Sequence, residues 1–179
     1  MLIISFGNIE MQSFQLDRKS GKKCYMLSAR SLSIACGDDG RSCNWIVVPD
    51  YRFHEVAYLR HMWLLGIGWM INILALSPNT QYATYLVFKM IDAEGFQNCP
   101  LELSVGVGGS HNSTEIVCYD PNVEGRLHNR VSQRRDGWLE IEIREFFNSG
   151  QEDEVLMNVK QRDYWKKDLL LAGIEVRPK

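Results

Sequence analysis

Apolar and polar residues alternate with a period of two along several segments, which predicts β-strands. Residues 139–144, LEIEIR, place apolar side chains on one face and charged side chains on the other. Residues 101–107 alternate in the same way, and 169–178 end in another alternation. Residues 84–90, TYLVFKM, form an unbroken β-branched and aromatic run, which is typical of a central strand covered on both faces.

Turn and helix signals separate these predicted strands. Residues 77–80, SPNT, and 120–125, DPNVEG, carry turn chemistry. A helix is expected over 51–60, where apolar residues follow helical spacing, and a second short helix over 144–148. Many strands, regular turns and few helices predict an all-β sandwich or jelly roll with one or two short helices.

The length of 179 residues suits one domain with a sizeable core. We expect residues 1–23 to be a lead-in and 24–179 to be the domain itself. The most apolar window, 63–76, is too short for a membrane span and should supply a buried strand or two. The first residues lack a basic region and a cleavage motif, so we expect no signal peptide and an intracellular chain with reduced thiols.

Charge and motifs argue for a binding domain and against an enzyme. The net charge is −2 with scattered basic residues, which disfavours nucleic acid as a partner. The chain carries no GxSxG, P-loop or GxGxxG motif, and its histidines are dispersed, so we expect no catalytic residue, metal or cofactor. Glu140 and Glu142 share a strand face and are expected in solvent, not paired for acid–base work.

The segment 33–46, SIACGDDGRSCNWI, holds two cysteines around an acidic turn. Cys36 and Cys43 are too far apart for ordinary zinc spacing, and no second pair accompanies them. A disulfide across a hairpin loop is conceivable in geometry, but an intracellular compartment argues against it. The interpretation we favour is two small, half-buried residues at the ends of neighbouring strands.

The five tryptophans suggest a ligand class. An exposed ring beside Asp, Asn or Glu can stack on the apolar face of a sugar while polar groups bind its hydroxyls. Most of these tryptophans should nevertheless lie in the core, and Trp138 and Trp165 are expected there.

Several ordered blocks together resemble the phloem protein 2 family of plants, also called the Nictaba-like lectins. The blocks are residues 21–46, 53–65, 76–90, 135–148 and 171–179. Residues 13–23 resemble the linker of the subgroup in which an F-box precedes the lectin domain, and these 179 residues contain no F-box.

The resemblance implies a jelly-roll β-sandwich that binds N-acetylglucosamine oligomers or N-glycan cores, without catalysis, in the nucleus and cytoplasm. In relatives with an F-box, the domain would recruit substrates to an SCF-type ubiquitin ligase. Components of that ligase are therefore expected partners if an F-box lies upstream, and an oligomeric state is left open.

The loop departs from the family pattern, which resembles W-G-D-D-P-x-Y-W-x-W. Cys36 and Cys43 stand at the first two tryptophan positions, and only Trp45 remains. By analogy with bases on aromatic side chains, each lost ring removes about 1–3 kcal/mol of stacking. The loop residues left for carbohydrate binding are Trp45, Asp38 and Asp39.

A second departure lies near the C-terminus, where the family has an acidic stretch followed by a glutamate in a strand. Here the acidic stretch is shortened to 150–155 and includes Glu154, and Asn158 stands at the later glutamate position. We therefore expect Glu154 and Asn158 to complete the carbohydrate site.

The alternative function is a protein-interaction or adaptor module whose sugar site has decayed. The replacement of two family tryptophans by cysteine motivates it. Gly68, Met70 and Leu74 also replace charged outward positions of the family, which predicts an apolar surface patch.

Overall fold

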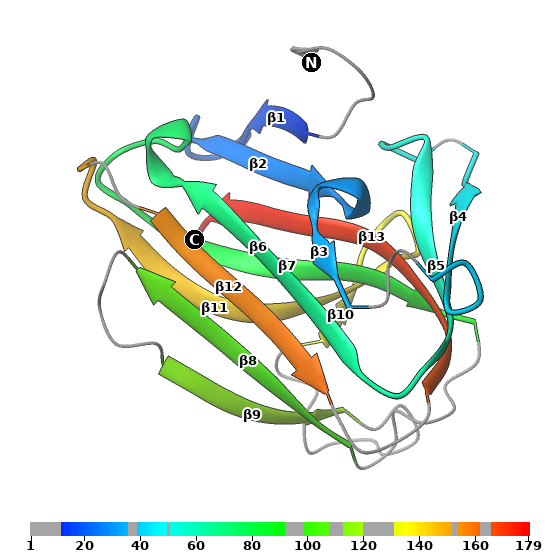
Figure 1. Cartoon of the computed structure of the whole chain (residues 1–179). Helices are drawn as coiled ribbons and strands as arrows, with labels where there is room; N and C mark the ends of the chain where they lie inside the picture. Colours follow the sequence, from blue (N-terminus) through cyan, green and yellow to red (C-terminus); the bar gives the residue numbers. More distant parts are fainter. Residues whose placement is uncertain are drawn as a thin grey trace.

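The computed structural model describes residues 12–35, 39–49, 51–91, 99–107, 113–119, 131–151, 154–161 and 166–179. Over these residues the protein is an all-β sandwich of two antiparallel sheets, which confirms the expected fold class. Figure 1 shows the two layers, with β6, β12 and β8 in one and β13, β7 and β11 in the other.

The larger sheet has eight strands in the order β1-β2-β13-β7-β11-β10, and β5 and β4 extend it beside β13. Its strands are β1 (Gln12–Leu16), β2 (Lys23–Ser28), β4 (Cys43–Val47), β5 (Glu55–Met62), β7 (Thr80–Met90), β10 (Val131–Gln133), β11 (Leu139–Asn148) and β13 (Lys166–Pro178). β13 lies at its centre because it pairs with β7 on one side and with both β2 and β5 on the other.

The smaller sheet has five strands in the order β3-β6-β12-β8-β9. They are β3 (Ser33–Ile34), β6 (Leu65–Asn72), β8 (Cys99–Val107), β9 (Ser113–Tyr119) and β12 (Glu154–Gln161). From β5 onward, each step along the chain passes from one sheet to the other. The exceptions are the two hairpins β8–β9 and β10–β11, whose strands pair within one sheet. Such repeated crossing is the connectivity of a jelly roll.

Apolar side chains fill the space between the sheets, as the alternation predicted. Ile141 and Ile143 of β11 face Leu103 and Val105 of β8 across this main core. A second, smaller cluster lies on the opposite face of the eight-stranded sheet, where Trp138 packs with other buried residues. The prediction that Trp138 is a core residue is confirmed, and Trp165 lies outside the described residues.

The two helix predictions are wrong. Residues 55–60 belong to strand β5 and residues 144–148 to strand β11. In β5, Val56 packs in the second cluster and Ala57 in the main core, so consecutive residues are buried on opposite faces. A strand covered on both sides loses its alternation, and its buried residues can then imitate helical spacing.

The helical turns in the described part of the chain are the short 3-10 turns η1 (Ala29–Ser31) and η2 (Ile73–Ala75). Within that part, no helix is long and apolar enough to span a membrane. The window 63–76 supplies one strand, β6, in which only alternate residues are buried, followed by the turn η2, where a buried strand or two were expected. Residues 12–16 form the edge strand β1, and the division of the chain at residue 23 stays a prediction.

Candidate functional site

The loop in which the resemblance places two family tryptophans connects the two sheets. It leaves β3 at the edge of the five-stranded sheet, where the Ala35 N–H donates a hydrogen bond to the Gly66 carbonyl at 2.7 Å. It enters the eight-stranded sheet at Cys43, the first residue of β4. Cys36 and Asp38 lie outside the described residues, so their roles stay predictions.

Asp39 is bound within the loop itself. Its carboxylate accepts hydrogen bonds from the backbone N–H of Arg41 at 3.1 Å and from the Ser42 hydroxyl at 3.1 Å. The hydrogen bond from the Arg41 backbone is the main reason why the pKa of Asp39 lies below its ordinary value. Asp39 therefore shapes this turn, as aspartate commonly does, and a sugar hydroxyl would have to share its oxygens with these donors.

Cys43 faces the main core. Its register partner on β5 is Leu59, and only 4% of Cys43 is exposed. It behaves here as a small core residue at the end of a strand, as the interpretation favoured from the sequence has it, but it is fully buried and not half-buried.

We expect Cys43→Trp to destabilise the protein, because the larger ring must enter a packed interior. Overpacking of this kind costs about 1–3 kcal/mol. Urea unfolding followed by circular dichroism measures the loss, with Cys43→Val as the control of similar volume. A Cys43→Trp variant as stable as the wild type would mean that a cavity accommodates the ring, contrary to this expectation.

Trp45 lies on the same face of β4 as Cys43, opposite Ala57 of β5. Its side chain is partly buried against the main core. The guanidinium of Arg30 covers the ring, with Arg30 Cζ 3.7 Å from the ring centroid. A contact of this type contributes about 0.5–2 kcal/mol, which overlaps the range of about 1–3 kcal/mol for one base stacked on an aromatic ring.

Glu55 of β5 holds Arg30 in this position. Its Oε2 atom accepts hydrogen bonds from Arg30 Nε at 3.1 Å and from Arg30 Nη2 at 2.9 Å. The side chains are 33% and 28% exposed. The sequence indicates neither residue, because they are 25 positions apart and belong to no catalytic or binding motif. Only the pairing of β4 with β5 brings Glu55 to the tryptophan.

Asn158 lies at the middle of the outward face of the five-stranded sheet. It pairs with Gly68 on β6 and with Ser104 on β8, which in turn pair with Ser33 on β3 and Thr114 on β9. We call these five residues the polar row. Strands lie about 4.8 Å apart, so the row crosses the sheet over about 19 Å.

Gly68 allows the Asn158 side chain to lie across β6. A Cβ atom at position 68 would be 3.0 Å from Asn158 Oδ1, closer than ordinary contact. The amide is half-buried, and the described part of the structure contains no hydrogen bond from this side chain. Its oxygen and its N–H groups are therefore open to an external partner.

Larger side chains flank the polar row on the same face. Met70 and Leu156 are register partners on one side of it and are 56% and 45% exposed. Lys160 and Glu102 are register partners on the other side. This exposure of Met70 confirms the predicted apolar surface in this region, and Leu74 of η2 is exposed as well.

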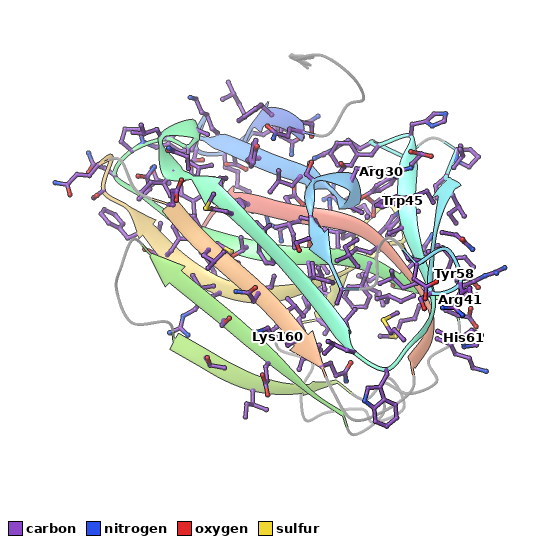
Figure 2. The ribbon with its side chains drawn as sticks, in the orientation of Figure 1. Arg30, Arg41, Trp45, Tyr58, His61 and Lys160 are labelled. Carbon is purple, nitrogen blue, oxygen red and sulfur yellow. The ribbon has the colours of Figure 1, made fainter. Side chains whose placement is uncertain are left out.

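Glu154 lies on the same outward face as Asn158, with Leu156 between them on β12. It pairs with Asn72 of β6 and is exposed. Figure 2 shows Trp45 beside Arg30 near β4, and Lys160 at the end of β12, in a different part of the molecule. The predicted site residues form two groups: Asp39 and Trp45 lie in the loop and on β4, with Trp45 packed against the core between the sheets, whereas Glu154 and Asn158 lie on the outward face of β12.

Groups of three or more His, Cys, Asp or Glu side chains that could hold a metal ion do not occur among the described residues. The polar groups of both sites are amide, hydroxyl and charged side chains on rigid strands. Such groups can bind and orient a polar ligand.

Known proteins share much of this sequence. Residues 22–178 match the family Phloem protein 2. F-box protein PP2-B10 of Arabidopsis thaliana is 40% identical over 177 residues, which cover 94% of this chain and 65% of that protein. F-box protein SKIP3 of the same plant is 35% identical, over 99% of this chain and 63% of that protein. The chain thus spans somewhat under two thirds of these relatives.

Solved structures with a similar arrangement are distant in sequence. The module TmCBM61, in complex with β-1,4-galactotriose, is 10% identical with a TM-score of 0.42, over 83% of this chain and 87% of that one. The mannan-recognising module TmCBM27 is 8% identical with a TM-score of 0.40, over 95% and 90%. We draw no conclusion from likenesses at this level. The family match and the curated relatives do settle the classification: this chain belongs to the phloem protein 2 family.

Proposed function

We propose that this domain binds carbohydrate as a lectin does, without catalysis, and that N-acetylglucosamine oligomers or N-glycan cores are its ligands. Membership of the phloem protein 2 family supports the class of function. The observation that carries the location is the polar row on the outward face of the five-stranded sheet, with Asn158 at its centre.

The chemistry of this face suits a sugar. Asn158 and the hydroxyls of Ser33, Ser104 and Thr114 offer donors and acceptors to sugar hydroxyls. The exposed pair Met70 and Leu156 alongside offers an apolar surface to the C–H face of a pyranose. Short side chains in the row leave space for the ligand between the larger flanking residues.

Asn158→Ala is expected to weaken binding of triacetylchitotriose between two- and tenfold, because one hydrogen bond contributes about 0.5–1.5 kcal/mol. Asn158→Glu, which restores the family carboxylate, is expected to bind more tightly than the wild type, since charged acceptors make stronger hydrogen bonds. Isothermal titration calorimetry measures both affinities.

The control is Gln133→Ala, which removes an exposed amide from β10 in the other sheet and should leave the affinity unchanged. An Asn158→Ala variant that binds like the wild type would place the sugar elsewhere. A folded wild-type protein that does not bind any N-acetylglucosamine oligomer would refute the proposed ligand class.

A role as a protein-interaction module is the second candidate. It is supported by the exposed apolar side chains of Met70, Leu74 and Leu156 and by the burial of Cys43 where the family has a tryptophan. The matched relatives are named F-box proteins. If an F-box precedes this chain in the cell, the domain would present glycosylated or protein substrates to an SCF ubiquitin ligase in the cytoplasm and nucleus.

A further inference from the structure

The tryptophan left in the loop is not open to solvent as a stacking surface. Arg30 lies over its ring with Cζ 3.7 Å from the centroid, and the rest of the Trp45 side chain packs against the main core. Figure 2 shows the two labelled side chains next to each other beside β4. A sugar ring that stacked on Trp45 would take the place that the guanidinium occupies.

The guanidinium is held there from two elements of the fold. Arg30 extends from the turn η1 and donates through Nε and Nη2 to Glu55 Oε2 on β5. Glu55 lies on the same face of the β4–β5 ribbon as Ala57, the register partner of Trp45. Arg30 thus stacks on Trp45 and is hydrogen-bonded to Glu55, and we call these three side chains the arginine cap.

We infer that Arg30 competes with a sugar ring for Trp45 and so determines whether this tryptophan contributes to carbohydrate binding. The inference rests on the proposed carbohydrate function. A stacked guanidinium and a stacked ligand ring interact with tryptophan with similar strength, so exchanging one for the other yields little net affinity. Cys43 is a buried thiol and offers no second ring in the loop. In the wild type, binding therefore depends on the polar row and not on Trp45.

Removal of the cap tests this competition. Arg30→Gln should expose Trp45, and acrylamide should then quench its fluorescence more strongly; subtracting the signal of the matching Trp45→Phe protein isolates this residue. In the same variant, triacetylchitotriose should protect Trp45 from acrylamide, whereas in the wild type, where the ligand binds at the polar row, it should leave the quenching of Trp45 unchanged. Trp45→Ala alone should change the wild-type affinity for this ligand less than twofold, because Trp45 does not belong to the polar row.

Arg60→Gln is the matched control, because Arg60 lies on the same ribbon with its Cζ 5.7 Å from the ring of Tyr58. It should alter neither the quenching of Trp45 nor the affinity. Circular dichroism checks the fold of every variant. If Arg30→Gln does not fold, Glu55→Gln keeps the arginine but removes its anchor and should shift both readings in the same direction.

The outcomes separate this inference from the proposed function. Protection of Trp45 by the ligand in Arg30→Gln supports the cap even if the wild type does not bind, in which case the lectin function of the natural protein fails. Wild-type binding without protection of Trp45 in Arg30→Gln, with Trp45 shown to be exposed, overturns the cap and leaves the lectin function intact. A fivefold loss on Trp45→Ala alone also overturns the cap, since the arginine would then move aside for the ligand. Absence of binding by every variant refutes both.

Discussion

Gly173→Ala is expected to lower the free energy of unfolding by about 3 kcal/mol or more, since a strained backbone alone costs about 1–3 kcal/mol. Gly173 has φ +148°, a conformation that side chains disfavour, and it follows a register shift between β13 and β7. A Cβ atom here would lie 1.9 Å from the carbonyl oxygen of Leu27 on β2. β13 and β2 would have to separate at the centre of the larger sheet.

Urea unfolding of the wild type and Gly173→Ala measures this loss. Gly40→Ala is the matched control, because a Cβ atom at Gly40 would meet nothing within 4 Å. We expect that control to stay within about 1 kcal/mol of the wild type. Equal stability of the two variants would show that β2 and β13 can move apart without cost.

Glu140→Gln is expected to destabilise the protein by about 3 kcal/mol, because it removes one member of a buried ionic network. Glu140 Oε2 accepts hydrogen bonds from Arg134 at 2.9 Å and from Arg177 at 2.8 Å. Both arginines also pair with the buried Glu175. Glutamine keeps the shape of the side chain but leaves the two arginines with Glu175 as their one buried carboxylate, besides the more exposed Asp136 that pairs with Arg134 at 3.5 Å.

The pH dependence follows from the pKa of Glu140. Burial raises this pKa, but the hydrogen bond and charge of Arg177 and the charge of Arg134 outweigh burial, so the pKa lies below the ordinary value of 4.5. A lowered folded-state pKa stabilises the protein above the unfolded pKa, and the benefit disappears as the pH falls through the folded pKa. The difference between wild type and Glu140→Gln should therefore be full near pH 7 and shrink below about pH 4.5.

Glu142→Gln is the control for this network. Glu142 lies two residues away on the same face and accepts a hydrogen bond from the Tyr85 hydroxyl at 3.2 Å, but its charged partner is Lys179, whose side chain is 42% exposed. An exposed pair of this kind contributes about 0–1 kcal/mol. Equal losses for the two variants, or a loss at Glu140 that does not change with pH, would contradict the assignment of a buried network at Glu140.

The burial of Glu140 in this network differs from the expectation drawn from the sequence. Glu140 and Glu142 were both expected in solvent, yet the side chain of Glu140 is only 9% exposed. The alternation LEIEIR correctly places both glutamates on the face away from the main core. It cannot indicate that Arg134 and Arg177, from two other parts of the chain, cover one of them. The period of a strand defines its faces, whereas burial of the outer face depends on neighbours that are distant in sequence.

The candidate site, too, was only partly predictable from the sequence. The resemblance assigned Glu154 and Asn158 to one site, but the strand that carries both was not predicted. Strand β12 places them four residues apart on one outward face. That the hydroxyls of Ser33, Ser104 and Thr114 lie in line with Asn158 follows only from the register of four strand pairs. Neither β6 nor β8 carries a motif that indicates this register.

The sequence by itself determined the all-β class, the strands β6, β7, β8, β11 and β13, and the family. Alternation, turn residues and ordered blocks are local signals, and local signals suffice for these. Only the tertiary structure decided that β5 is a strand, that Arg30 covers Trp45, and that the two groups of site residues lie apart. Each of these depends on which strands pair and in which register, and strand pairing is set by the packing of the whole sandwich.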